Sequence, residues 1–262
     1  MTSVVSLSRY PVKGFTPEPL DSIVVQDDGR VAGDRVLAFR FGNAALPEEK
    51  DGLDYWPKAR GLSLQDFPSL AALRLEYQQA ERVLRFWRDG ELLVEGDLEP
   101  AGRRRLETAM AEIVLGSPEA ARLERPGRLP LALVGDGVTS RFQDRARGFV
   151  SVHSEASVAT LADALGAAVD HRRFRSNIVI TGVEAEAELR WADTVRIGDV
   201  AFEPQGSIVR CLATHANPET GVRDLPVLTT LTQQLGQRQP TMGRLLLPTD
   251  RGGVIQLGDT VC

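Results

Sequence analysis

Short runs with a strand-like period, separated by tight-turn signals, most strongly restrict the fold of this chain. The segment 37–41 alternates Leu and Phe with smaller or charged side chains such as Arg40, which is the period of a half-buried strand. Two further runs, 82–88 and 91–95, flank Asp89-Gly90, a hairpin signal. Many short strands with few helices predict a mainly β, barrel-like architecture rather than regular βαβ alternation.

A few short helices are also predicted, from apolar residues at helical spacing. They begin after Pro100, Ser154 and Pro226, and the last two end at Gly166 and Gly236. Their apolar stripes are Leu106, Met110 and Ile113; Val158, Leu161 and Leu165; and Leu228, Leu231 and Leu235. Three adjacent arginines, 103–105, predict a solvated face on the first helix.

The sequence predicts a division of the chain into two domains. Residues 116–130 contain Ser117-Pro118 and Arg125-Pro126-Gly127, which are loop signals. We therefore predict an N-terminal domain at 1–116 and a C-terminal domain at 117–262. The total of 262 residues is long enough for one large domain or two modest ones.

Composition restricts the classes of function. The formal charge of -5 argues against general nucleic-acid binding, and two cysteines cannot form a disulfide framework or a four-cysteine metal site. The first ten residues lack a basic leader, and no run reaches the about 20 apolar residues of a membrane span. We expect a protein of the reducing cytoplasm, with neither nucleic acid nor membrane as a partner.

Cys211 is the strongest candidate for chemistry. It follows Arg210 and an apolar run, and it precedes the turn signal Asn217-Pro218; the other cysteine is the terminal Cys262. An adjacent cation stabilises a thiolate, which is the nucleophilic and soft-metal-binding form. The alternative is a small buried hydrophobe, the usual role of a free cysteine.

Four cations lie where apolar strands meet turns: Lys13, Arg35, Arg175 and Arg210. Together they could neutralise an anionic ligand, since the planar guanidinium binds pairs of phosphate oxygens. Taken singly, each is an ordinary surface charge or a partner for one of the many acids. The three histidines have no metal-ligand spacing, and we expect them on the surface or satisfied in the core: His153, His171 and His215.

At these residues the sequence resembles the molybdenum cofactor sulfurase C-terminal (MOSC) domain proteins and the β-barrel domain that accompanies them. The N-terminal part of the resemblance rests on Arg9-Tyr10-Pro11-Val12-Lys13-Gly14 and Gly33-Asp34-Arg35. The C-terminal part rests on 151–157, 173–179, Ile197-Gly198-Asp199, Arg210-Cys211, Asn217-Pro218 and Leu257-Gly258-Asp259. Each string is weak alone, whereas their order and spacing together are specific.

The resemblance implies a β-barrel MOSC domain and a β-barrel-like N-terminal domain that bind the molybdenum cofactor, Mo-molybdopterin, with no requirement for pyridoxal phosphate. By similarity to the amidoxime-reducing members, Cys211 would be the molybdenum ligand and catalytic residue. The residues implied to surround the cofactor are Lys13, Arg35, Ser154, Arg175, Asn177, Arg210 and Thr214.

The implied function is an oxidoreductase that reduces N-hydroxylated or N-oxygenated small molecules. The alternative is a non-catalytic cofactor carrier, or a sulfur carrier with a persulfide on Cys211. Two departures from the amidoxime-reducing pattern are Gly14 in place of a serine and Met242-Gly243-Arg244-Leu245 in place of a Phe-Gly-x-Tyr segment. No ferredoxin-type cysteines follow, so we expect a separate electron-donor protein of the ferredoxin or flavin/heme reductase type.

Overall fold

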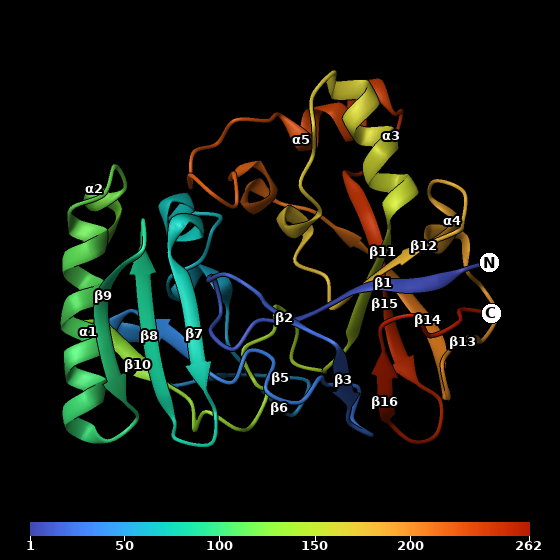
Figure 1. Cartoon of the computed structure of the whole chain (residues 1–262). Helices are drawn as coiled ribbons and strands as arrows, with labels where there is room; N and C mark the ends of the chain where they lie inside the picture. Colours follow the sequence, from blue (N-terminus) through green and yellow to red (C-terminus); the bar gives the residue numbers. More distant parts are fainter.

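The computed structural model describes residues 1–262 and is mainly β, as predicted (Figure 1). Its largest element is a seven-stranded sheet that curls into a half-barrel. In spatial order the strands are β13 (Val195–Ile197), β14 (Val200–Val209), β15 (Thr241–Pro248), β11 (Val150–Ser154), β12 (Ile178–Thr181), β1 (Ser3–Arg9) and β2 (Glu18–Leu20). The core beneath it is formed by small and β-branched residues such as Val152, Ile178 and Ile180, which are suited to a pleated sheet.

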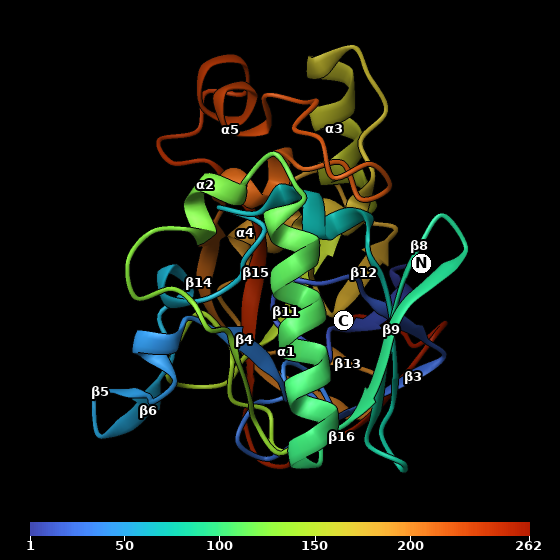
Figure 2. The same ribbon diagram turned by 90° about the vertical axis from the view of Figure 1, so that its left-hand side faces the viewer.

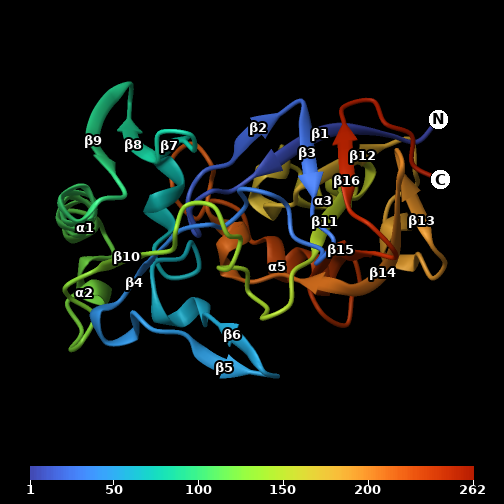
Figure 3. The same cartoon turned by 90° about the horizontal axis from the view of Figure 1, so that it is seen from below.

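The first strand of the chain completes this otherwise C-terminal sheet. β1 pairs antiparallel with β12, which itself runs parallel to β11. β3 (Ser22–Val25) pairs with β16 (Gly253–Gln256), and Val261 N donates to Thr2 O, so both ends of the chain lie together (Figures 1 and 3). The predicted division at residue 116 stays a prediction, and β1 and β2, from residues 3–20, belong to the sheet built mainly by residues beyond 150.

A second core lies at the other end of the molecule, where α1 (Pro100–Leu115) packs against a three-stranded sheet (Figure 2). The sheet is the meander β7 (Arg74–Gln78), β8 (Val83–Arg88) and β9 (Glu91–Asp97). Beside it lie β4 (Ala38–Arg40) with β10 (Ala132–Val134), the hairpin β5 (Glu48–Lys50) with β6 (Leu53–Tyr55), and α2 (Ala120–Leu123). Phe15, from the loop after β1, packs into this core and so ties the two ends together.

Two of the three remaining helices contact the seven-stranded sheet, and the third contacts the 3₁₀ turn at Leu212–His215. They are α3 (Glu155–Leu165), α4 (Ala187–Arg190) and α5 (Val227–Thr229), the last continued by a π turn at Thr230–Gln234. Short 3₁₀ turns at His171–Phe174 and Leu212–His215 connect them to the strands. No helix is long and apolar enough to cross a bilayer.

Most predicted helix and hairpin signals are confirmed. Asp89 and Gly90 form the turn between β8 and β9 with φ of 51° and 81°, a backbone that Asp and Gly tolerate. Ser154 caps α3 by accepting from Ser157 N at 3.1 Å, and Gly166 ends it in the left-handed region.

Three local predictions are wrong in detail. The strand at 37–41 is buried on both faces, and Arg40 is only 1% exposed because backbone carbonyls accept its N–H groups. The predicted solvated face is confirmed for Arg104 and Arg105, which are exposed, but Arg103 is half-buried and its guanidinium donates to the carbonyls of Leu98, Leu133 and Gly135, which braces α1 against the end of β10. In addition, the predicted linker at 116–130 contains the helical turn α2.

Candidate functional site

Tyr10 occupies the centre of the candidate site, in the loop that leaves β1. It is 2% exposed; its backbone N–H donates to Asp34 Oδ1 at 2.8 Å and its hydroxyl donates to Ser176 O at 3.3 Å. Burial raises the pKa of Tyr10, although the nearby Arg175 and Arg35 oppose this. The phenol is therefore neutral at physiological pH, and its ring offers an electron-rich face to cations.

Arg35 and Arg175 both lie against this ring. The guanidinium carbon of Arg35 is 4.9 Å from the ring centroid and that of Arg175 is 4.3 Å away. The two arginines also contact each other, since Arg35 Nη2 donates to Arg175 O at 3.3 Å. The structure thus brings together two of the predicted anion-binding residues from segments 140 positions apart in sequence.

The pKa values of Arg35 and Arg175 shift in opposite directions. Burial disfavours the charged form of Arg35, but its ion pair with the buried Asp34 outweighs burial and raises the pKa of Arg35. Arg175 has no carboxylate partner, and burial, together with the nearby charge of Arg35, lowers its pKa to about 10. Its Nη1 donates to Phe15 O at 2.5 Å, while its Nε and Nη2 have no protein acceptor. Arg175 remains charged at neutral pH with unused donors.

Lys13 lies close to this pair but is already engaged. Its Nζ forms an ion pair with Asp144 Oδ1 at 2.9 Å and donates to Trp56 O at 3.4 Å. Burial lowers the pKa of Lys13, while Asp144 opposes this. The next residue, Gly14, has φ of +87°, and a Cβ there would lie 3.0 Å from Leu62 O. A serine at this position would therefore be strained, which accounts for the glycine.

Arg210 and Cys211 lie at the end of β14. The Arg210 guanidinium braces the site, because Nε donates to Met242 O at 2.7 Å and Nη1 to Phe174 O at 2.6 Å. Burial lowers the pKa of Arg210 to about 10; neighbouring Cys211 raises it and Arg35 lowers it, so these groups share one electrostatic environment. Cys211 itself is a free, half-exposed thiol at the start of the 3₁₀ turn Leu212–His215.

The side chains of three predicted cofactor-binding residues form hydrogen bonds with other protein groups. Ser154 Oγ bonds to Ser157 and to Glu188 Oε2 at 2.9 Å. Asn177 Oδ1 accepts from Ser151 Oγ at 2.8 Å, and Thr214 Oγ1 donates to Cys211 O at 3.0 Å. All three side chains are buried, and their role toward a cofactor stays a prediction.

Reasoning from sequence missed several residues of this region. Tyr10, Asp34 and Arg173 lie within the strings that carried the resemblance, so those strings did contain a signal. Arg173 is buried and pairs with Asp224 at 2.7 Å, fixing the 3₁₀ turn that precedes Arg175. Glu188 is completely buried without a salt-bridge partner, and nothing in the sequence marked it.

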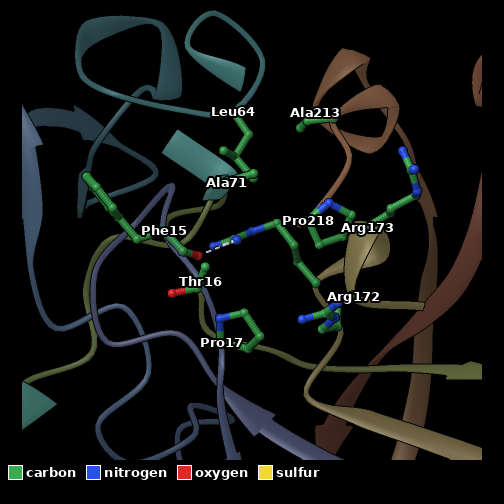
Figure 4. A pocket seen from close by; sticks show the side chains of 11 residues that line it. Phe15, Thr16, Pro17, Leu64, Ala71, Arg172, Arg173, Ala213 and Pro218 are labelled. Carbon is green, nitrogen blue, oxygen red and sulfur yellow. Dashed lines mark hydrogen bonds between the residues drawn. The ribbon is translucent and has the colours of Figure 1, made fainter. Parts of the chain in front are cut away.

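A small pocket opens beside Arg175, between the two parts of the molecule. Figure 4 shows the N-terminal part lining one side and the C-terminal part lining the other. Its residues are Phe15, Thr16, Pro17, Leu64 and Ala71 on the first side, and Arg172, Arg173, Arg175, Ala213, Ala216 and Pro218 on the second. The Arg175–Phe15 hydrogen bond crosses this pocket, so the site depends on both parts.

The histidines do not form a metal site. His153 is fully buried, its ring packs edge-on against Phe174 at 5.6 Å, and neither ring nitrogen has a partner. Burial lowers the pKa of His153 well below 6.5, with Arg210 and His171 contributing. His215 does find a partner, because Leu228 N donates to its Nε2 at 3.2 Å. The expectation of satisfied or surface histidines is therefore wrong for His153.

No group of three or more His, Cys, Asp or Glu side chains is placed to hold a metal ion. A metal at Cys211 would have to bring its other ligands with it. Arg175 with its unused donors, the charge of the adjacent Arg35 and the accessible Cys211 thiol could instead bind an anionic ligand that carries a soft metal.

Comparison with known proteins agrees with this arrangement. Residues 140–262 match the MOSC domain, so the C-terminal part of the chain is a MOSC domain, and the predicted resemblance is confirmed there. Mitochondrial amidoxime-reducing component 1 of Homo sapiens is 35% identical over 118 residues, which cover 41% of this chain and 34% of that protein. Mitochondrial amidoxime reducing component 2 of Rattus norvegicus gives the same identity and coverage.

The chain spans about a third of the length of the curated relatives it matches. Among solved structures, the YuaD protein from Bacillus subtilis aligns with 100% of this chain and 94% of its own at 11% identity, with a TM-score of 0.42. The relatives are named as mitochondrial, and a cytoplasmic location of this chain stays a prediction.

Proposed function

We propose that this chain binds a molybdenum–pterin cofactor beside Cys211 and acts as an oxidoreductase toward N-oxygenated small molecules. The observation that carries the proposal is the meeting of Arg35 and Arg175 on Tyr10, in one electrostatic environment with Arg210 and Cys211. The MOSC domain and the amidoxime-reducing relatives support it from sequence.

The donor groups present fit such a cofactor. Its phosphate needs cations with free N–H donors, and Arg175 retains Nε and Nη2 for this purpose. Its metal needs one soft ligand from the protein, and Cys211 is half-exposed and free of any disulfide. Lys13 and Arg210 contribute charge more than hydrogen bonds, because their donors already bond to protein atoms.

When bound, the cofactor would supply the electron transfer that removes oxygen from an N–O bond. The chain would hold it through Cys211 and the arginines, while the pocket beside Arg175 would exclude water from one side. Phe15, Leu64 and Ala71 give that pocket an apolar wall, but its volume of about 30 Å³ is too small for an organic substrate, which would bind outside it. Electrons would come from a separate electron-donor protein rather than directly from NADH, because the sequence shows no dinucleotide-binding fingerprint that would bind NADH.

Metal and pterin analysis tests the proposal directly. Full-length protein from a host that makes the cofactor should contain molybdenum and a phosphorylated pterin in near-equal amounts. Cys211→Ser should lose most of the molybdenum, because serine is nearly isosteric but a poor soft ligand. Cys262→Ser should retain it, since that thiol is exposed. Folded wild-type protein without molybdenum from a competent host would refute the proposal.

Activity separates the enzyme from the carrier. With an artificial one-electron donor, the loaded protein should reduce an amidoxime or hydroxylamine, and with NADH alone it should not. A persulfide on Cys211 found by mass spectrometry, in protein without reductase activity, would favour the sulfur carrier instead. Loaded protein that reduces no N-oxygenated compound and carries no persulfide would leave cofactor storage as the function.

A further inference from the structure

Two guanidinium groups of like charge share the ring of a single buried tyrosine. Arg35 and Arg175 lie 4.9 Å and 4.3 Å from the Tyr10 centroid, well within the range of a cation–π contact. In the absence of a ligand the two groups repel each other, since Arg35 lowers the pKa of Arg175. Only one of them has an acidic partner, because Asp34 pairs with Arg35 alone.

The backbone of both arginines is also unusual. Arg35 has φ of 50° and Arg175 has φ of 53°, a left-handed conformation that few residues other than glycine adopt. Such conformations persist where the surrounding structure imposes them, and they concentrate at ligand-binding sites. Here the side chains are carried into contact with one ring from two distant loops.

Hydrogen bonds also connect Tyr10 to both loops, through its backbone carbonyl to one and through its hydroxyl to the other. Arg35 N donates to Tyr10 O at 2.7 Å, and the Tyr10 hydroxyl donates to the carbonyl of Ser176, the residue after Arg175. The ring therefore helps to set where the two guanidiniums lie, while these hydrogen bonds fix Tyr10 against both loops.

We propose that Tyr10 is a positioning residue that holds Arg35 and Arg175 as a pair directed at one multiply charged oxyanion of the phosphate class. The identity of this anion as the cofactor's phosphate rests on the function proposed above, whereas the pairing itself does not. The ring offsets the repulsion between the two cations before the ligand arrives. The side chains of Arg35 and Arg175 are therefore already ordered, which lowers the entropy cost of binding the ligand.

The test uses the full chain from a host that cannot make the cofactor, titrated with inorganic phosphate by calorimetry at low ionic strength. Tyr10→Phe keeps the ring and should bind within about twofold of wild type. Tyr10→Leu removes the ring face and should bind about 5- to 30-fold more weakly, the range expected for lost cation–π contacts. The matched control is Tyr77→Leu: Tyr77 is equally buried, and no cation lies over its ring.

Tyr77→Leu should lower the melting temperature but leave phosphate affinity unchanged, which separates positioning from general stability. Wild-type affinity in Tyr10→Leu, or an equal loss in both leucine variants, would overturn the proposal.

Should Tyr10→Leu fail to fold, NMR of the Arg35 and Arg175 side chains in wild type and in Tyr10→Phe decides. Both should show upfield ring-current shifts and both should respond to phosphate; a response from one arginine alone would refute the pairing. Absence of molybdenum in protein purified from a host that makes the cofactor would count only against the proposed function.

Discussion

The arginine cluster (Tyr10, Arg35 and Arg175) and the Ser154 network (Ser154, Ser157 and Glu188) both contain predicted cofactor residues, yet they use their polar groups in opposite ways. Arg175 keeps N–H donors without a protein acceptor. In contrast, both serine hydroxyls bond to Glu188, which is completely buried. A residue type shows what a position could bind, while its neighbours decide whether that capacity is already used.

The difference follows from the shape of the side chains. A serine hydroxyl is close to the backbone, so once buried it must bond to whatever lies within a short reach. Arginine carries several N–H donors on a long planar group, and it can brace a carbonyl and still present donors elsewhere. Arg175 does this through a single bond to Phe15 O.

The largest effect should come from breaking the Ser154 network at its acceptor. Glu188→Ala leaves Ser154 N, Ser154 Oγ and Ser157 Oγ without their acceptor in a buried site. We expect a loss of about 2–4 kcal/mol in the free energy of unfolding, measured by urea denaturation. Glu188→Gln keeps one acceptor oxygen and should lose less. A change below about 0.5 kcal/mol in the alanine variant would mean that the network is not structural.

Next in size is the effect on the arginine cluster. Arg175→Lys keeps the charge but loses the planar fork, and cofactor retention should weaken by about 1–3 kcal/mol. The measurement is molybdenum and pterin remaining after dialysis. Arg85→Lys is the control, because that guanidinium is already paired with Glu76 and Glu95 on the three-stranded sheet and does not line the pocket. Equal retention in wild type and Arg175→Lys would make Arg175 an ordinary charge.

His153 differs from both regions, because its two buried ring nitrogens have no hydrogen-bond partner. His153→Leu removes two unsatisfied ring nitrogens from the core and should stabilise the protein by about 1 kcal/mol at pH 7. The folded pKa of His153 lies well below 6.5, so the unfolded chain takes up a proton first and wild-type stability falls as pH drops below about 6.5.

The leucine variant lacks this proton uptake. Its advantage over wild type should therefore widen between pH 7 and pH 5, as measured by thermal unfolding across that range. Some acid dependence should remain, because the pKa of His215 is also lowered by burial. An advantage that stays constant with pH would show that His153 is partnered in solution.

The smallest effect should come from Ser154 alone. Ser154→Ala removes the cap of α3 and should cost about 1 kcal/mol of stability, while phosphate affinity stays at the wild-type value. Calorimetric titration beside urea denaturation measures both quantities. Weaker phosphate binding without loss of stability would return Ser154 to the cofactor site and remove the contrast between the two regions.

Local signals predicted local structure well. The turn at Asp89-Gly90, the cap at Ser154 and the stop at Gly166 all lie where they were expected, because each depends on the conformational preferences of a few neighbouring residues. Burial was predicted less well. Arg40 lies in the core because the carbonyls of Ala44 and Pro57 accept from its guanidinium, and the second of these comes from 17 residues further along the chain, beyond the reach of a local pattern.

The sequence by itself determined the mainly β class, the helix ends and the types of residue at the candidate site, since these follow from short-range preferences and side-chain chemistry. Only the tertiary structure decided that β1 enters the C-terminal sheet and so brings Tyr10 into contact with both Arg35 and Arg175. It also decided that the hydroxyl of Ser154 donates its hydrogen bond to the buried Glu188. Both outcomes depend on which distant segments share hydrogen bonds and buried volume, and spacing along the chain contains no direct record of either.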